Sequence, residues 1–402
     1  MTAIVGVLNK HAVAIAADSA VTLGGGRKVL NSANKLFALS KYHPVAIAIF
    51  GNAELVGTPW EIIIKEFRKS IGNQSFNTLQ EYAICFFKFL KGKNYYCNGI
   101  EALQQLKESI ISFVQKIINI SDVNKLEFIL QQYETCCKHP YLDGLSDESV
   151  EFINVNLDNE LKVSINLLKQ KGIKSDDNHL RNILKTILTK DVLNPDLTGL
   201  VFSGYGELEV YPSIIHYTVG NVINGTLAFK QQPSVIIDKQ NRSSICPFAQ
   251  TDVMCTLLDG IAPKVQSIYI KTLLKTFDTV IDSLSNLIQQ KDPELALQVK
   301  NLNKDQFMRL FDVLSNQARK KDYTQPFIAS VANLEKDDLA DFAESLIKLT
   351  SLKRKVSPDQ ETIGGPVDVM VISKGDGVIW MKRKHYFDSN LNHNFFSNYY
   401  NL

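Results

Sequence analysis

Three residues near the amino terminus carry groups that could do chemistry together. Thr2 follows Met1, and removal of Met1 would leave a hydroxyl and a free α-amine on one residue. An α-amine ordinarily has a pKa of ~7.7–8.0, so near neutrality it can take the hydroxyl proton while the oxygen attacks a carbonyl. Asp18 and Lys35 could place a carboxylate and an ammonium beside that nucleophile. The pattern predicts amide-bond hydrolysis by an N-terminal threonine.

Two short strands must bring these residues together. Residues 4–8 and 12–17 have the apolar patterning of strands, and residues 9–11 have the composition of the turn that joins them. The second strand ends at Asp18. Lys35 follows a turn that contains three consecutive glycines. A hairpin and this glycine turn would therefore bring the acid and the lysine to the first residue of the first strand.

The order and spacing of these residues resemble the amino terminus of proteasome β subunits and of HslV, the peptidase of a bacterial ATP-dependent protease. In that resemblance the family's N-terminal threonine matches Thr2, its acid matches Asp18 and its catalytic lysine matches Lys35. The spacing from Thr2 to Lys35 is one residue longer than in the family, and the glycine turn accommodates the extra residue. The resemblance implies a threonine-type peptidase without a cofactor or metal.

The resemblance also implies residues that would bind the substrate. It places Thr22, with Val21 before it, beside the substrate backbone. It assigns the N–H that would hold the oxyanion to Ala48, where the family usually has glycine, and Gly51 closes the same strand. Only the N–H is needed for this role, so alanine is chemically acceptable.

A third implied group surrounds two glycines near the carboxyl end. Gly364 and Gly365 match the family's glycine pair beside the active site, and Asp359 and Thr362 lie near its accessory acid and hydroxyl. Neither accessory residue aligns cleanly: Asp359 is one residue too far upstream, and the family's serine position is Ile363. The tuning of the threonine amine by this loop is therefore the weakest part of the resemblance.

The fold implied by the resemblance is α+β: a four-layer αββα sandwich of antiparallel sheets, the architecture of N-terminal-nucleophile hydrolases. Two helical segments without a catalytic motif would interrupt it. The sandwich would comprise residues 2–95, 199–277 and 334–388, the helical insertions residues 96–198 and 278–333, and the carboxyl-terminal tail residues 389–402.

Composition excludes some classes of partner. The chain has 402 residues, enough for a sizeable core, and its 44 basic and 42 acidic residues give a net charge of +2. No overall field favours nucleic acid or a membrane surface, and no run approaches the ~20 apolar residues of a membrane span. No secretory signal precedes the strand-forming amino terminus, so we expect a cytoplasmic protein.

The six cysteines are expected to be reduced thiols, several of them buried as small hydrophobes. They form no Cys-x-x-Cys pair. Residues 136–139, Cys-Cys-Lys-His, are the one segment with a histidine near cysteines, and we expect no metal site there.

The leading hypothesis is a proteasome-like threonine peptidase acting on peptides or unfolded polypeptide as a homo-oligomeric ring, with an ATP-dependent unfoldase as a further partner. Two alternatives stay open. The chain could be an amidohydrolase of a small amide, or a catalytically silent assembly or binding subunit, which the unmatched accessory residues and the insertions favour. Lys35 is expected to be a solvated loop residue, so its removal should abolish hydrolysis at little cost in stability.

Overall fold

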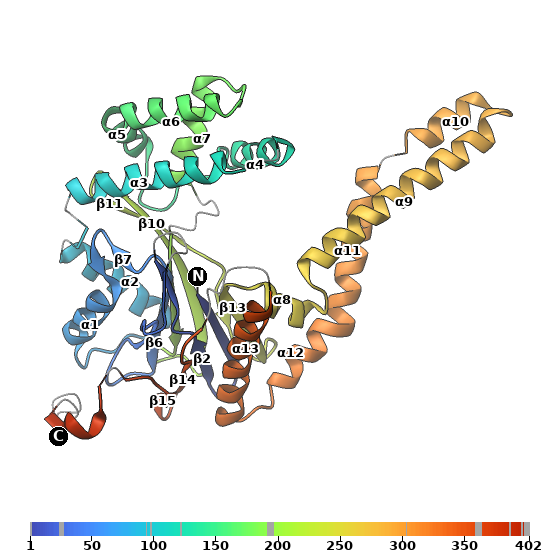
Figure 1. Ribbon diagram of the computed structural model, residues 1–402. Coiled ribbons are helices and arrows are strands. Elements are labelled where there is room, and N and C mark those ends of the chain that lie inside the picture. The colour runs from blue at the N-terminus through green and yellow to red at the C-terminus, as the bar shows by residue number, and fades with distance from the viewer. Residues whose placement is uncertain are drawn as a thin grey trace.

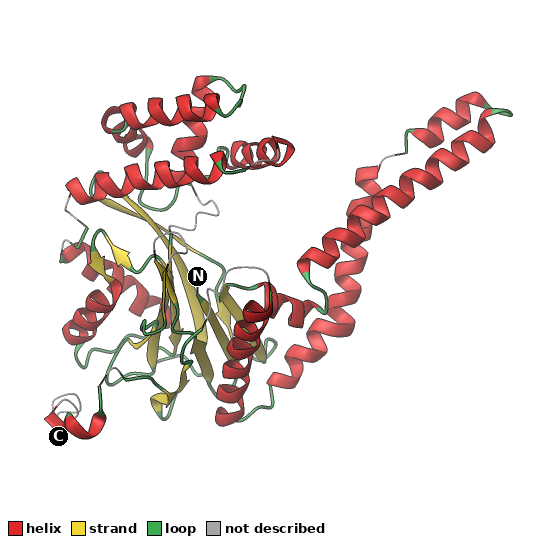
Figure 2. Ribbon diagram, in the orientation of Figure 1, coloured by secondary structure: helices red, strands yellow, loops and turns green. Residues whose placement is uncertain are grey.

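The protein is described from a computed structural model. The structure describes residues 2–23, 28–93, 95–96, 99–120, 123–190, 197–302, 304–357, 364–385, 387–394 and 397. Figures 1 and 2 show a central pair of sheets, helices on either side of them, and a long helical arm that projects away.

Two antiparallel sheets form the centre of the molecule. The first consists of β1 (Ala3–Asn9), β2 (Val13–Ala17), β13 (Ser243–Ala249), β14 (Asp368–Ser373) and β15 (Gly377–Lys382), in the spatial order β13-β1-β2-β14-β15. The second consists of β5 (Leu36–Ala38), β6 (Val45–Gly51), β9 (Thr198–Gly204), β10 (Ser213–Ile223), β11 (Thr226–Gln231) and β12 (Val235–Ile236). Its order is β11-β10-β9-β6-β5, with β12 paired to β10.

The strands β1 and β2 are buried on both faces, which is why nearly every residue in them is apolar. One face of the first sheet, with Ile4 and Ile15, packs against Ala46 and Val201 of the second sheet. The opposite face, which includes Val5, packs against helices. The two sheets therefore form a sandwich whose inner layer is packed mainly with apolar side chains.

Helices cover the outer face of each sheet. α1 (Trp60–Ile71) and α2 (Leu79–Gly92) pack on the second sheet, and α8 (Asp252–Asp259) and α13 (Lys336–Val356) pack on the first. The aromatic residues Trp60, Phe67 and Phe86 fill the first of these layers. The order helix, sheet, sheet, helix confirms the α+β, four-layer αββα prediction.

Five helices lie between α2 and β9 in the chain: α3 (Gly99–Ile118), α4 (Val123–Cys136), α5 (Asp147–Asn156), α6 (Asp158–Gln170) and α7 (Asp177–Thr189). They share a hydrophobic cluster of their own, which reaches the sandwich through Ile223 of β10. Figure 1 shows them as a separate group at one end of the sandwich. The domain boundaries inferred from the sequence stay predictions.

The projecting arm is built from α9 (Pro263–Gln289), α10 (Pro293–Lys300), α11 (Lys304–Arg319), a π-helical turn (Lys320–Thr324) and α12 (Gln325–Val331). α9 begins upstream of residue 278, and Pro263 lies in its first turn, where a missing N–H costs nothing. Among the described helices, none combines the length and apolar character that a bilayer span requires.

Two short ribbons and a 3-10 turn complete the described elements. β3 (Val21–Leu23) pairs with β4 (Lys28–Leu30), and β7 (Glu54–Leu55) pairs with β8 (Thr58–Pro59). The 3-10 turn is η3 (Ser389–Leu391). The β3–β4 ribbon leaves the first sheet just after β2, so it lies next in the chain to Asp18.

Candidate active site

The β1–β2 hairpin places Asp18 beside the start of the chain. The register pairs Ile4 with Ala17, so the next pair outward is Ala3 and Asp18. The amide of Asp18 donates to the carbonyl of Ala3 at 3.2 Å. In return, Oδ1 of Asp18 accepts the amide of Ala3 at 2.9 Å. The carboxylate is thus fixed next to the residue that follows Thr2.

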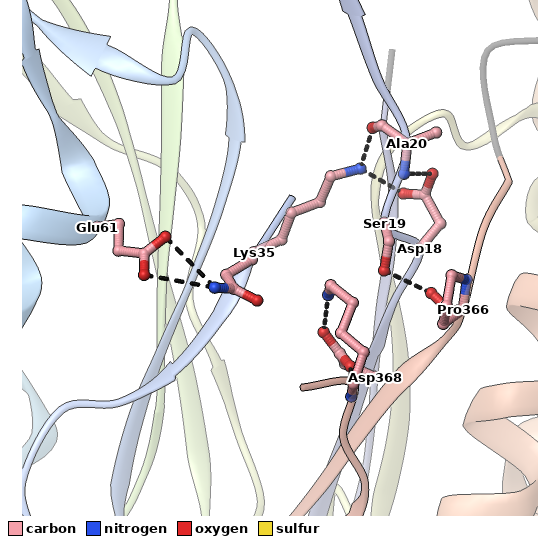
Figure 3. A network of polar contacts seen from close by, with 9 residues as sticks. Asp18, Ser19, Ala20, Lys35, Glu61, Pro366 and Asp368 are labelled. Atoms are coloured by element: carbon pink, nitrogen blue, oxygen red, sulfur yellow. Dashed lines mark hydrogen bonds and ion pairs between the residues drawn. The ribbon is translucent and has the colours of Figure 1, made fainter. Parts of the chain in front are cut away.

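Lys35 reaches the same carboxylate from the other sheet. Its backbone precedes β5, and its Nζ donates to Oδ1 of Asp18 at 2.6 Å and to the carbonyl of Ala20 at 2.6 Å. Figure 3 shows the extended lysine side chain crossing to Asp18. Lys35 is 4% exposed and Asp18 1% exposed. One carboxylate oxygen therefore joins the amide of residue 3 to a buried ammonium, and the pair links the two sheets.

The second oxygen of Asp18 is also occupied. Its Oδ2 accepts the amide of Ala20 at 3.1 Å and the amide of Gly364 at 3.3 Å. Four donors thus surround this carboxylate, three of them backbone amides. Because a buried polar group is costly unless it is hydrogen-bonded, these four bonds offset the cost of burying the carboxylate.

The glycine pair Gly364-Gly365 lies against this network. The amide of Ser19 donates to the carbonyl of Gly364 at 3.2 Å, and the Ser19 hydroxyl donates to the carbonyl of Pro366 at 2.5 Å. Gly365 has a φ of +75°, and a Cβ there would lie 2.8 Å from the Cβ of Asn31. Both the backbone angle and the close approach require glycine at this position.

The electrostatics of Lys35 combine burial with opposing charges. Burial lowers the pKa of the Lys35 ammonium from its ordinary value, because desolvation penalises the charged form. The charge of Asp18 and its hydrogen bond oppose that effect. More distant charges also act: Lys384 lowers this pKa and Asp368 raises it.

Asp368 and Lys384 are charged residues near the site that the sequence reasoning missed. Asp368 opens β14 and forms a buried ion pair with Lys384, whose backbone N–H also donates to it at 2.8 Å. A signal was present in the sequence, because an aspartate interrupts the alternating apolar residues of this strand between Val367 and Val369. Nothing in the sequence pattern shows whether Lys382 or Lys384 pairs with it.

Thr2 lies at the edge of this cluster and is 8% exposed. Its carbonyl accepts the amide of Gln250, which continues the pairing of β1 with β13. Met1 lies outside the described residues. Ala3 shares Oδ1 of Asp18 with Lys35, so Thr2 is one residue along the chain from a group bonded to the ion pair.

The amide of Ala48 faces β9 rather than the lysine. The amide of Asn52 donates to the carbonyl of Leu197 at 3.4 Å, which shows that backbone N–H groups of even-numbered residues in β6 point toward β9. Ala48 is paired there with Val201. Because backbone N–H groups alternate in direction along a strand, the Ala48 amide serves the sheet ladder.

Odd-numbered residues of β6 face the side on which Lys35 lies. The amide of Ile49 donates to the carbonyl of Lys35 at 2.9 Å. Gly51, two residues later, has its N–H on this same side, beyond the first residue of β5. Gly51 has a φ of +83°, and a Cβ there would lie 2.0 Å from the carbonyl oxygen of Leu197, so only glycine fits.

The residues expected to bind the substrate backbone lie on the β3–β4 ribbon. Val21 is half-buried and pairs with Leu30, and the backbone of Thr22 pairs with Val29. The side chain of Thr22 lies outside what the structure describes, as do Asp359 and Thr362. Within the described chain β3 is paired only with β4, so its other edge has no strand partner.

The described residues contain no group of three or more His, Cys, Asp or Glu side chains arranged to hold a metal ion. Cys136 and Cys137 are half-buried free thiols, and Cys246 is buried on β13. Burial raises the pKa of the Cys246 thiol to about 11, so this thiol is a packing group at neutral pH.

Fold and site together define an αββα sandwich with a buried Asp–Lys pair bonded to the first strand. No protein-family profile matches the chain, and no curated protein matches it. Among solved structures, the chain matches the helical assembly of the Anbu complex from Pseudomonas aeruginosa at 8% identity, covering 100% of this chain and 95% of that chain. The TM-score is 0.26, too low to carry an argument about kinship or activity.

These comparisons correct the family assignment made from the sequence. The chain was assigned to proteasome β subunits and HslV, with two large helical insertions, on a few residues in the right order. That assignment is wrong, because no family profile and no curated protein supports it. The assignment rested on a few spaced residues out of 402, and a chain can have such a pattern without belonging to the family.

Proposed function

We propose that this protein is a threonine hydrolase of amide bonds that acts on peptides, with Thr2 as its nucleophile. The observation that carries the proposal is the bonding of Asp18: one oxygen joins the buried Lys35 ammonium to the amide of Ala3. A buried charge pair of this kind is costly to form, and its perturbed lysine marks a candidate functional site.

The proposed reaction begins when the bond before Thr2 is cleaved and its α-amine becomes free. The Thr2 hydroxyl then attacks the substrate carbonyl while the α-amine takes the hydroxyl proton. The ammonium of Lys35 favours the unprotonated amine by charge repulsion, and Asp18 holds that ammonium in place. The protonated amine then passes its proton to the leaving amine, and an ester on Thr2 remains. Water hydrolyses this ester and restores the hydroxyl.

An oxyanion forms in both steps and needs an N–H donor. The sequence reasoning gave this role to Ala48, whose amide is directed into the ladder with β9. We propose Gly51 for it, since its amide lies on the Lys35 side of β6, where the β5 ladder has already ended.

Peptide is favoured over a small amide by the edge of β3. An extended peptide can pair with an unpaired strand edge through its backbone, and Val21 and Thr22 would then contact it as expected. Gly364 and Gly365, fixed against Ser19 and Asn31, would hold the opposite side of the site. Asp359 and Thr362 keep only their predicted accessory role.

We expect the purified, active protein to begin at Thr2. The physical reason is that an acylated nitrogen cannot act as the base, so Thr2 works only with a free amine. Intact-mass spectrometry checks the amino terminus, and the same sample is assayed with fluorogenic peptides and with small acyl amides. Complete retention of Met1 in a preparation that hydrolyses peptides would refute the mechanism. Hydrolysis of small amides alone favours the amidohydrolase alternative, and no acylation of a free Thr2 favours the silent binding subunit.

A second expectation concerns assembly. The arm carries large apolar side chains that are exposed, among them Ile268 (59%), Leu287 (75%) and Leu314 (56%). Exposed apolar surface on this scale marks contact sites in soluble proteins. We propose that copies of this chain associate through the arm. A homo-oligomer would also enclose the nucleophile, and a ring, an ATP-dependent unfoldase and a cytoplasmic location stay predictions.

Light scattering at micromolar concentration tests this assembly. We expect an oligomer for the wild type and a smaller species for Leu287→Glu combined with Leu314→Glu, because each change places a charge in the contact. The matched control is Val155→Glu, an equally exposed site (69%) on α5, far along the chain from the arm. A monomeric wild type contradicts the proposal.

A further inference from the structure

A second buried ion pair lies beside the first. The register of β14 with β2 pairs Asp368 with Ala17, the residue before Asp18. Figure 3 shows Asp368 on the strand next to that of Asp18. Its carboxylate bonds both the backbone N–H and the ammonium of Lys384. Asp368 is 5% exposed and Lys384 12% exposed. The two ion pairs therefore lie at neighbouring positions, one at the end of β2 and the other at the start of β14.

We propose that Asp368 and Lys384 are positioning residues for Lys35: they place one charge of each sign beside the Asp18–Lys35 pair and so set how firmly the ammonium is held. The relevance of this positioning role to catalysis rests on the proposed function, in which Lys35 acts on the α-amine of Thr2. The electrostatic coupling itself stands on the geometry. The β2–β14 ladder fixes Asp368 beside Asp18, and the amide bond fixes the residue that carries the second ammonium.

An ion pair that served only to join two elements would not need to be buried to this extent. The ion pair of Lys382 on β15 with Glu344 of α13 joins a strand to a helix with a lysine that is largely open to water. Lys382 is 50% exposed, whereas Lys384 is 12% exposed. Enclosing charges this far costs desolvation energy, and the charges then act strongly on any ionisable neighbour because water screens them little.

The two charges act on Lys35 in opposite directions. Burial is the main influence on the pKa of Lys35 and lowers it, while Asp18 raises it. Beyond Asp18, the described charges that act on this ammonium are Lys384, which lowers its pKa, and Asp368, which raises it. Removal of Lys384 should therefore raise the pKa of Lys35, and removal of Asp368 should lower it. Loss of a merely structural pair has no reason to give opposite signs.

The test is a direct titration of Lys35 by NMR in full-length protein labelled at the lysine ε-carbon. The Lys35 signal is identified by its loss in Lys35→Arg. We expect Lys384→Met to raise the pKa of Lys35 and Asp368→Asn to lower it, each by roughly half a pH unit or more.

The matched control is Lys382→Met. It removes a lysine from the same stretch of chain and breaks an ion pair, yet Lys382 contacts Glu344 on the outer helical layer. We expect the pKa of Lys35 to be unchanged in this variant. A shift as large as that in Lys384→Met would show that any disturbance of β15 moves Lys35, and it would overturn the proposal.

Two further variants separate charge from packing. Lys384→Arg keeps the positive charge and should leave the pKa of Lys35 unchanged. This variant can be measured even if Lys384→Met folds poorly. The double variant Asp368→Asn with Lys384→Met removes both charges, leaves no unpaired partner and should fold where either single variant does not. In it Lys35 should shift less than in either single variant. Shifts of the same sign in both single variants, or none in any, overturn the proposal.

The titration needs no turnover, so it is independent of the proposed function. Reaction of free Thr2 with an electrophilic acyl probe, followed by intact mass, reports on that function separately. Opposite shifts in the pKa of Lys35, in a protein whose Thr2 forms no adduct, support the coupling of Lys384 and Asp368 to Lys35. They overturn only the proposed catalytic role of Thr2. An adduct on Thr2 without opposite shifts in the pKa of Lys35 supports the catalytic role of Thr2 and overturns the proposed coupling.

Discussion

Thr2→Ala is expected to lower the rate of amide hydrolysis by about 10⁴-fold or more, because it removes the attacking oxygen and leaves the α-amine without a hydroxyl to activate. The measurement is release of the amine from a fluorogenic peptide under single-turnover conditions. Intact mass after exposure to an acyl probe should show an adduct on the wild type and none on the variant.

Thr2→Ser is the matched variant, since it keeps both the hydroxyl and the α-amine. We expect it to retain adduct formation and part of the hydrolysis rate. Thermal unfolding of all three proteins should differ only modestly, because Thr2→Ala removes one hydroxyl and one methyl group, and Thr2→Ser one methyl group, each worth about 1 kcal/mol. Hydrolysis by Thr2→Ala at the wild-type rate would remove Thr2 from the mechanism.

Lys35→Ala is expected to abolish hydrolysis and also to destabilise the protein by about 3–5 kcal/mol, because Asp18 would be left as a buried carboxylate without its cation. The second part corrects the expectation drawn from the sequence. Lys35 is 4% exposed and pairs with Asp18 at 2.6 Å, so it is not a solvated loop residue. Urea unfolding measures the loss of stability, and the peptide assay measures the loss of rate.

The controls for Lys35 separate charge from burial. Asp18→Asn combined with Lys35→Met removes both charges and should recover part of the stability lost in Lys35→Ala, without recovering hydrolysis. Lys65→Ala breaks an ion pair with Glu61 in which both side chains are largely exposed, and its effect should be small because water screens that pair. A Lys35→Ala variant as stable as Lys65→Ala would contradict the burial argument.

The sandwich could be predicted because its signals are local. The nearly continuous apolar runs of β1 and β2, the glycine-rich turn between β14 and β15 and the apolar stripe of α13 each depend on neighbours in the chain. The pairing of Asp18 with Lys35 required the resemblance, because nothing local in the sequence brings residue 35 to residue 18. Its burial could not be foreseen from residue types, since lysine is usually exposed.

Two other features of the site could not be predicted because they depend on strand register. Whether an amide in β6 faces β9 or β5 depends on odd or even position, and one residue of slip reverses the answer. Ala48 and Gly51 therefore could not be distinguished before the ladder was known. Asp368 and Lys384 lie in different elements, and only the pairing of β14 with β2 brings their charges to Asp18.

The bond between Asp18 and Gly364 spans 346 residues of chain. During synthesis the amino terminus leaves the ribosome first, long before Gly364 and Pro366 exist to bond Asp18 and Ser19. The complete network around Asp18 therefore forms only after residues 364–366 have been made and folded against it. A nascent chain thus carries its threonine in an unfinished setting, and a truncated product that stops before residue 364 never completes it.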